Sequence, residues 1–277
     1  MNNSIYYEYN NIDKYIKDLD IFQSKYTIIK IIKKNSKKIS YIVTDITGKK
    51  FFCKVKLNND VTQDEIIIYK FLKEHSNKYI NKILNIYQNQ YFLIIISEFI
   101  NGCILDDYLI NNKNELYEIF NKIIKGVSFL HENSIIHADL KLDNIMINNN
   151  EPIIIDFDLS KKIKEGLITS LKVSGTKFYI PPETINNNIY SFKNDIWALG
   201  IIFFLLSTSP QNVLTNTYFF ELYIYDNILL ELYKKNININ MINIIFSMIN
   251  NDFNLRPDIN LISTQIELLL NISNNEL

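Results

Sequence analysis

The sequence predicts an α+β protein with a small, β-rich N-terminal lobe that holds one main helix and a larger, mostly helical C-terminal lobe. Three observations support this prediction. Over residues 26–57, apolar residues alternate or run together with β-branched and aromatic residues. From residue 114 onward, apolar residues recur with helical spacing. A chain of 277 residues with 47% hydrophobic residues is long enough for one large domain or two lobes.

The N-terminal lobe is predicted from short-period patterns. Strands are expected within 26–57, where Thr47-Gly48-Lys49 has the composition of a hairpin turn. A further buried strand is expected between Gln90 and Phe99, where apolar residues follow one another. The segment 62–74 is expected to form the main helix of this lobe, because four side chains recur at helical spacing: Glu65, Ile66, Tyr69 and Leu72.

The C-terminal lobe begins where the pattern changes to that of an amphipathic helix. This helix is marked by apolar residues at i, i+3 and i+4 spacing: Leu116, Ile119, Phe120, Ile123, Ile124, Val127 and Leu130. Two short apolar runs, 145–147 and 153–155, flank a turn rich in asparagine and predict a hairpin. Further helices are expected at 194–207, 218–234, 240–250 and 259–271.

Composition and charge exclude several classes of function. Lys plus Arg of 29 against Asp plus Glu of 30 gives a net charge of −1, so we expect neither nucleic acid nor a membrane surface as a partner. Two cysteines, Cys53 and Cys103, are too few for a disulfide framework or a zinc site. The apolar runs are shorter than the roughly 20 residues of a membrane-spanning helix. We therefore expect a cytoplasmic chain, and a monomer.

The residues that carry chemistry follow the long helix. The segment His137-Ala138-Asp139-Leu140-Lys141-Leu142-Asp143-Asn144 precedes the predicted hairpin, and Asp156-Phe157-Asp158 follows it. Phosphoryl transfer needs a carboxylate for the hydroxyl nucleophile, a cation for the γ-phosphate and oxygen ligands for magnesium. Asp139 and Lys141 supply the first two, and Asn144 with Asp156 would hold the metal.

Four ordered motifs resemble those of the eukaryotic protein kinase family, serine/threonine type. Two are quoted above, and the others are Gly175-Thr176-Lys177-Phe178-Tyr179-Ile180-Pro181-Pro182-Glu183 and Asp195-Ile196-Trp197-Ala198-Leu199-Gly200. The resemblance covers about residues 22–272 and implies a bilobal fold. The implied parts are an N-lobe at 22–97, a hinge at 98–103 and a C-lobe at 104–272, with an N-terminal extension at 1–21 and a tail at 273–277.

The same resemblance implies a buried ion pair between Glu183 and Arg256. Arg256 is the one arginine of the whole chain, and a planar guanidinium can bond a carboxylate through two parallel contacts that a lysine cannot make.

The resemblance also implies how ATP and magnesium are bound. Lys54 would grip the α- and β-phosphates, with Glu65 as its partner on the main helix, although Asp64 or Glu74 could fill that role. Ser97 would be the gatekeeper, and the backbone of Glu98 and Ile100 would face adenine. Ile39 and Met146 are assigned to the same adenine pocket, with Met146 as its floor.

The chain departs from the family pattern at four places. The loop at 32–37, expected to cover the phosphates, has no glycine, and Phe52 occupies the position of the usual roof alanine. Asp158 stands in place of a glycine. Ala138 stands in place of an arginine that often meets a phosphate, which argues against control by phosphorylation at three candidate positions: Thr169, Ser170 and Ser174.

The sequence therefore favours a protein kinase that uses ATP and Mg²⁺ to phosphorylate serine and threonine hydroxyls of protein substrates. The altered loop and Phe52 keep open a pseudokinase that acts as a binding module, and a small-molecule phosphotransferase is the third hypothesis. Among the remaining residues, His137 is expected to brace the catalytic loop, and His75 and His131 to lie at the surface or at helix ends. Cys53 is expected to be a small buried hydrophobe.

Overall fold

The computed structural model describes residues 24–35, 37–163, 166–170, 172–208, 232 and 237–275. Two compact units divide the chain, the first made of residues up to Ser76 and Asn81–Asn101, the second of Asn77–Ile80 and residues from Gly102 onward. The predicted extension at 1–21, nearly all of the predicted helix at 218–234 and the last two residues of the tail lie outside the described residues.

The boundary between the units falls inside the predicted hinge, but one short segment of the predicted N-lobe falls in the C-terminal unit. Residues 77–80 belong with the C-terminal unit. The backbone N–H of Ile154 donates to the Tyr79 carbonyl oxygen (2.8 Å), and Ile80 forms an isolated parallel bridge with Ile154. Backbone pairing across a long stretch of sequence is not visible in a local pattern, which explains the difference.

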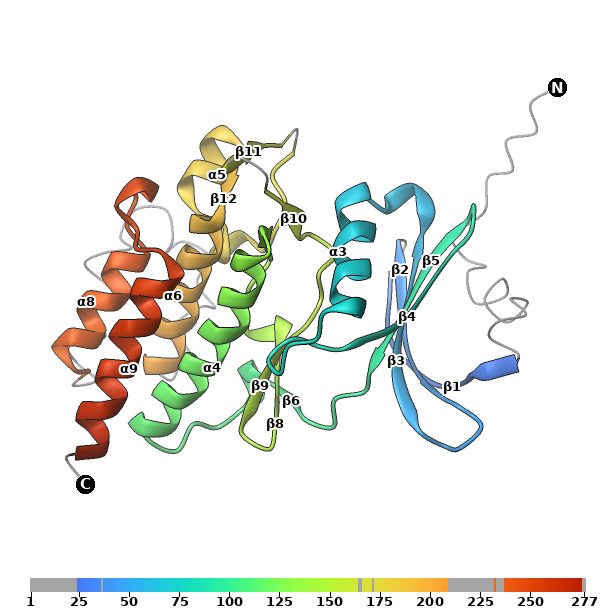
Figure 1. Cartoon of the computed structure of the whole chain (residues 1–277), viewed down its shortest axis with the longest axis horizontal. Coiled ribbons are helices and arrows are strands. Elements are labelled where there is room, and N and C mark those ends of the chain that lie inside the picture. Colours follow the sequence, from blue (N-terminus) through green and yellow to red (C-terminus); the bar gives the residue numbers. More distant parts are fainter. Residues whose placement is uncertain are drawn as a thin grey trace. The chain divides into compact units, whose positions relative to one another are not determined.

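The N-terminal unit is built on one antiparallel sheet (Figure 1). Its strands run in the order β1 (Thr27–Lys34), β2 (Lys38–Thr44), β3 (Lys50–Leu57), β5 (Phe92–Glu98) and β4 (Ile83–Gln88). The strands predicted over 26–57 and 90–99 are confirmed. Strand β4 was not predicted, because it mixes apolar with polar residues and carries a register shift between Ile83 and Asn85.

The predicted turn between β2 and β3 is confirmed, and its sequence explains it. Gly48 has a φ of 84°, a conformation that glycine adopts without strain. The Asp45 carboxylate oxygen Oδ1 accepts from the backbone N–H groups of Thr47 (2.9 Å) and Lys49 (3.0 Å). This turn fixes the register in which Lys54 pairs with Ser40.

The main helix of this unit is α3 (Gln63–Glu74), which matches the predicted segment. The Thr62 side chain accepts from the backbone N–H of Glu65 (3.1 Å) and caps the helix. The buried side chains of α3 are Glu65, Ile68, Tyr69 and Leu72, and their i, i+3, i+4 and i+7 spacing places them on one face. This face therefore turns one carboxylate and one phenol inward.

The larger helices of the C-terminal unit are α4 (Lys113–Glu132), α6 (Phe192–Thr208), α8 (Ile239–Met248) and α9 (Ile259–Asn275). They lie side by side in Figure 1, with α4 against α6 and α9, and α8 against α6 and α9. The rings of Phe120 and Phe203 stack with centroids 3.5 Å apart. The predicted helices in these places are confirmed, and the α+β class is confirmed with them.

Short elements of the same unit carry the loops of the candidate site. Strand β8 (Ile145–Asn148) pairs with β9 (Glu151–Ile154) as the predicted hairpin and with β6 (Cys103–Ile104). Strand β7 (Ile135–Ile136) pairs with β10 (Lys161–Lys162), and β11 (Leu167–Thr169) with β12 (Ile189–Ser191). Helix α5 (Pro182–Asn187) precedes β12. The 3₁₀ turns described in this unit are Leu105–Asp107, Leu142–Asn144, Lys177–Tyr179 and Phe253–Leu255, and Asn58–Asp60 is a 3₁₀ turn of the N-terminal unit.

Within the described part of the chain, none of the helices is both long enough and apolar enough to cross a membrane.

Candidate active site

Asp139 is the centre of a polar cluster in the loop that joins β7 to β8. The Thr176 hydroxyl donates to Asp139 Oδ1 (2.8 Å), and the Lys141 ammonium lies 3.2 Å from Asp139 Oδ2. Lys141 also donates to Thr176 Oγ1 (2.7 Å), and Asn144 Nδ2 donates to Asp139 Oδ2 (3.0 Å). The structure thus brings together Asp139, Lys141 and Asn144 as predicted, and it adds Thr176.

The geometry of this cluster suits a carboxylate that handles a hydroxyl group. The side chain of Asp139 is 13% exposed and that of Lys141 20%, so both are partly buried but reachable from solvent. The contact of Thr176 shows that Oδ1 accepts from an aliphatic hydroxyl. The charge of Lys141, which donates to that hydroxyl, is of the sign that would stabilise a transferring phosphoryl group.

The backbone of the loop is held in place by Asp195, which lies in the first turn of α6. Its carboxylate is 1% exposed and accepts from the backbone N–H groups of His137 (2.8 Å) and Ala138 (3.0 Å). Ala138 has a φ of 63°, a strained conformation for a residue with a Cβ. Two backbone bonds to one carboxylate therefore keep the loop in a shape that it would not hold alone.

A histidine that was expected at the surface or at a helix end also supports Asp195. His131 lies in the last turn of α4, its side chain is only 7% exposed, and its Nε2 lies 3.0 Å from Asp195 Oδ2. The helix-end position is correct, but the side chain is buried. Burial by itself raises the pKa of Asp195, but the hydrogen bond and charge of His131 and the bond from the His137 backbone N–H outweigh burial and leave that pKa below its ordinary value of 3.8.

Replacing Asp195 by asparagine is expected to lower the free energy of unfolding at pH 7 by about 2–3 kcal/mol, because an amide NH₂ would face backbone donors. The lowered pKa of Asp195 in the folded chain means that its contribution is complete above the unfolded pKa and is lost as the pH falls through the folded one. Urea unfolding of wild type and D195N between pH 7 and pH 3 should show the gap closing at the acid end. A gap that stays constant over this range would contradict the assignment.

His137 braces the loop as predicted. The side chain is buried, its Nε2 lies 3.1 Å from the Ile155 carbonyl oxygen, and its Nδ1 accepts from the backbone N–H of Asp139 (3.3 Å). A neutral imidazole with its proton on Nε2 satisfies both contacts. The ring therefore ties the loop to the end of β9.

Asn144 immediately precedes β8 and Asp156 follows β9, so both residues lie at the open end of the β8–β9 hairpin. The backbone N–H of Ile155 donates to the carbonyl oxygen of Asn144 (2.9 Å), which brings Asp156 close to it. The Asn144 amide nitrogen donates to two oxygens of Asp139, so its side-chain oxygen is the atom left for a cation. In the described residues no three His, Cys, Asp or Glu side chains gather as metal ligands. One carboxylate and one amide fit Mg²⁺, which keeps several of its waters.

The segment before α5 is shaped by Gly175 and Tyr190. Gly175 has a φ of 122°, and a Cβ there would lie 3.2 Å from the Ala138 carbonyl oxygen, so only glycine fits. The Tyr190 hydroxyl accepts from the backbone N–H of Ser174 (2.7 Å). These contacts place Thr176 beside Asp139. The segment and the loop line a pocket with about 260 Å³ of empty space, open solvent included, whose walls include Asp139, Thr176, Pro181 and Tyr190.

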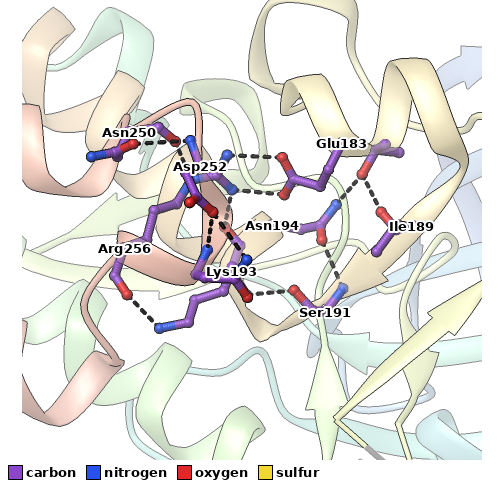
Figure 2. A network of polar contacts seen from close by, with 10 residues as sticks. Glu183, Ile189, Ser191, Lys193, Asn194, Asn250, Asp252 and Arg256 are labelled. Carbon is purple, nitrogen blue, oxygen red and sulfur yellow. Dashed lines mark hydrogen bonds and ion pairs between the residues drawn. The ribbon is translucent and has the colours of Figure 1, made fainter.

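The ion pair between Glu183 and Arg256 is confirmed and stands in a wider network (Figure 2). Arg256 Nη1 and Nη2 donate to Glu183 Oε1 (2.7 Å) and Oε2 (2.8 Å). Arg256 also donates to the backbone oxygens of Asn250 (2.8 Å) and Lys193 (3.0 Å). Glu183 is 6% exposed and Arg256 2%. The pair ties the start of α5 to the turn before α9.

In the N-terminal unit, Glu65 is paired with Lys56, which the sequence did not single out. The Lys56 ammonium donates to Glu65 Oε1 (2.6 Å) and Oε2 (2.7 Å). The Lys54 ammonium donates to the Tyr69 hydroxyl (3.3 Å). The prediction named Lys54 as the partner of Glu65 and did not consider Lys56, because the choice between two lysines on one strand face depends on where α3 lies on the sheet.

The assignment of Ile39 to the adenine pocket is wrong. Ile39 is fully buried in the apolar cluster on one face of the sheet, together with Val55, its neighbour on β3. Since side chains alternate along a strand, Lys54 points to the opposite face. Ile42, which pairs with Phe52, is on the face of Lys54 and is partly exposed.

The other residues predicted to contact adenine are placed as follows. Ser97 is buried, and its hydroxyl accepts from Asn81 Nδ2 (3.1 Å). The backbone N–H of Glu98 donates to the Lys82 carbonyl oxygen (2.9 Å), so a nucleotide contact at Glu98 would use its carbonyl group. Ile100 is buried, and Met146, in the C-terminal unit, is half-buried.

The loop without glycine is closed by Asn35. Asn35 Oδ1 accepts from the backbone N–H groups of Lys37 (2.9 Å) and Lys38 (2.8 Å), as in an Asx turn. These two N–H groups are therefore engaged within the protein. Ser36, in the middle of the loop, lies outside the described residues.

Comparisons with known proteins agree with this geometry. A family model described as a protein kinase domain matches residues 24–265. A probable serine/threonine-protein kinase 2 of Plasmodium falciparum is 32% identical over 198 residues, which are 66% of this chain and 38% of that protein. The probable serine/threonine-protein kinase fhkE of Dictyostelium discoideum is 28% identical over 208 residues, or 70% of this chain and 29% of its own length.

A third relative, a probable serine/threonine-protein kinase KIN1 homolog of Enterocytozoon bieneusi, is 29% identical over 215 residues, or 74% of this chain and 35% of its own length. The chain thus spans less than two fifths of the length of each of these three relatives. All three are named as protein kinases, and none of them as a small-molecule phosphotransferase.

Proposed function

This chain belongs to the protein kinase family, and we propose that it is an active enzyme that transfers the γ-phosphoryl group of ATP to serine or threonine hydroxyls of protein substrates. The observation that carries the proposal is the cluster around Asp139. The side chains of Lys141, Asn144 and Thr176 each lie within hydrogen-bond or ion-pair distance of its carboxylate, and Lys141 also donates to Thr176. A chain without a catalytic role has no evident need for a lysine, a carboxylate and an amide gathered in one loop.

In this proposal Asp139, Lys141 and Asn144 each have one task. Asp139 orients the substrate hydroxyl and accepts its proton, and Lys141 neutralises the charge on the transferring group. Bound ATP supplies the phosphoryl group, and magnesium shields its charge. The Asn144 side-chain oxygen and the Asp156 carboxylate would hold the metal, and Lys54 would bind the phosphates. The backbone of Glu98 and Ile100 and the side chain of Met146 are assigned to adenine.

A second function, that of a pseudokinase, is favoured by two observations. Asn35 occupies the backbone N–H groups of Lys37 and Lys38, and backbone N–H groups of this loop are the donors expected to hold phosphate oxygens. Phe52 is also partly exposed on the same sheet face as Lys54. A chain with these two features would bind a partner through its surface and would bind nucleotide weakly.

Thermal unfolding with ATP and magnesium, with ATP and a chelator, and without ligand separates the two functions. A ligand at 100 times its Kd stabilises the folded chain by about 2.7 kcal/mol, which raises the unfolding midpoint measurably. We expect a magnesium-dependent rise that is lost in Asp156→Ala, and incorporation of phosphate into serine or threonine peptides. A midpoint that does not move at millimolar ATP would favour the pseudokinase.

A further inference from the structure

Tyr190, on strand β12, has its ring in the core and its hydroxyl group on the segment before α5. The side chain is 1% exposed and packs in an apolar cluster with Ile136 and Ile163. The hydroxyl accepts from the backbone N–H of Ser174 (2.7 Å), lies 3.0 Å from its Oγ and donates to its carbonyl oxygen (3.2 Å). One phenol therefore contacts every polar group of one residue of the segment.

These contacts match the hydrogen-bonding capacity of the phenol. A hydroxyl group has one proton to donate and two lone pairs that accept. When the Tyr190 proton points to the Ser174 carbonyl oxygen, the lone pairs can accept from the Ser174 N–H and hydroxyl, so all three bonds form together. A phenylalanine ring would fill the same space in the core and would offer none of them.

Strand β12 is itself held from two sides. Asn194 Oδ1 accepts from the backbone N–H of Ser191 (2.7 Å), as Figure 2 shows. The Thr184 hydroxyl donates to the carbonyl oxygen of Ile189 (2.6 Å). The neighbours of Tyr190 in the sequence are thus bonded to α6 and to α5. The Tyr190 hydroxyl is therefore a fixed point for the segment that it contacts.

This fixed point is two residues away from the polar cluster around Asp139. Ser174 is followed by Gly175 and then by Thr176, whose hydroxyl donates to Asp139 Oδ1 (2.8 Å) and accepts from Lys141 (2.7 Å). Two residues of chain span at most about 7 Å. A small displacement of Ser174 is therefore expected to move the Thr176 hydroxyl away from the carboxylate, and displacements of about 1 Å are enough to slow a reaction.

We propose that Tyr190 is a positioning residue for phosphoryl transfer to the peptide. Its hydroxyl holds Ser174 and thereby keeps Thr176 beside Asp139, where the hydroxyl group of the peptide would be received. This inference rests on the proposed function. Among the described residues, the hydrogen bonds of this hydroxyl all involve Ser174. Tyr190 therefore acts on the peptide and on the transfer step, and leaves the binding of ATP unchanged.

Tyr190→Phe in the full chain tests the proposal, with Tyr108→Phe as the matched control. The Tyr108 hydroxyl makes two hydrogen bonds in the same unit, to Glu115 Oε1 (2.6 Å) and Asn150 Oδ1 (2.9 Å). Y190F is expected to lower kcat/KM for a serine or threonine peptide about five- to fiftyfold, as an unsatisfied donor would, and to keep the KM for ATP within about twofold. Y108F is expected to keep both constants.

Steady-state rates are measured well below the unfolding midpoint of each variant, so that the folded population is constant. A Y190F variant with the wild-type kcat/KM for the peptide would overturn the proposal. A KM for ATP that rises as much as the KM for the peptide would overturn it too, because such a change shows a general loosening of the fold. If Y190F does not fold, Ser174→Ala, which loses one of the three contacts, is expected to lower the same ratio about two- to fivefold, and no change would refute the role.

A double-mutant cycle with Thr176→Val decides whether Tyr190 acts through Thr176. Valine has nearly the shape of threonine and lacks the hydroxyl that bonds Asp139. Y190F/T176V is expected to transfer phosphate within about threefold of T176V, because the group that Tyr190 places is already gone. Losses that multiply would show that Tyr190 does not act through Thr176. If T176V is too slow to assay, the same cycle is measured as the Kd of a labelled peptide by fluorescence anisotropy.

The wild-type chain separates the two levels of the argument. If it transfers no phosphate to peptides, the proposed function fails, and the role of Tyr190 in transfer fails with it. If it is active and Y190F is equally active, the proposed function stands and the role of Tyr190 alone fails.

Discussion

Arg256→Met is expected to lower the free energy of unfolding by about 3–5 kcal/mol, because removing one partner of a buried pair leaves the other charge uncompensated. Arg256 satisfies both oxygens of Glu183 and the carbonyl groups of Asn250 and Lys193. Its guanidinium carbon also lies 4.8 Å from the ring centroid of Trp197. Urea unfolding followed by circular dichroism at pH 7 measures the change.

Two further variants identify the cause of that loss. Arg256→Lys keeps the charge but cannot form two parallel bonds, so it should fall between wild type and R256M. The double variant E183L/R256M removes both charges and should recover much of the lost free energy. Should R256M unfold within about 1 kcal/mol of wild type, the network in Figure 2 would contribute little to stability.

Asp139→Asn is expected to reduce phosphate transfer by at least 10³-fold, which corresponds to about 4 kcal/mol in the activation free energy. An amide cannot accept the hydroxyl proton, although it can still accept a hydrogen bond from Thr176. The side chain is partly exposed, so the unfolding midpoint should change little. Initial rates on a serine or threonine peptide, measured beside thermal unfolding, separate the chemical effect from the structural one.

Asp143→Asn is the matched control, since Asp143 lies in the same loop with an exposed side chain. It should keep the transfer rate of wild type. Transfer by D139N at more than a tenth of the wild-type rate would exclude Asp139 as the proton acceptor and would direct the search to another carboxylate.

Much of the candidate site could be predicted because its residues are close in the sequence. Asp139, Lys141 and Asn144 lie within six residues of one another, and the hairpin that follows them is marked by apolar runs and a turn rich in asparagine. A loop that short leaves few ways to arrange three polar side chains around one carboxylate. The pair of Glu183 and Arg256 was predicted from the resemblance to the protein kinase family, in which these two positions pair, and the one arginine of the chain occupies the second of them.

What the sequence could not predict shares one physical cause. Lys54 and Lys56 have the same spacing pattern and the same chemistry, and only the placement of α3 on the sheet decides that Glu65 meets Lys56. Ile39 was assigned to the wrong side of the sheet, because alternation identifies two faces without telling which one is the closed core. His131 lies at the end of α4, one of the two places expected for it, but its contact with Asp195, 64 residues away, could not be predicted.

The sequence by itself determined the two kinds of unit, most of the helices and strands, and the loop that carries Asp139, because periodicity, turn residues and short-range spacing act locally along the chain. Tertiary structure alone decided which lysine neutralises Glu65, which face of β2 is buried, and how Asp195, Thr176 and Tyr190 hold the loop and the segment beside it. These contacts join residues that are 9 to 64 positions apart. They depend on how helices pack on strands and on one another, which a local pattern does not encode.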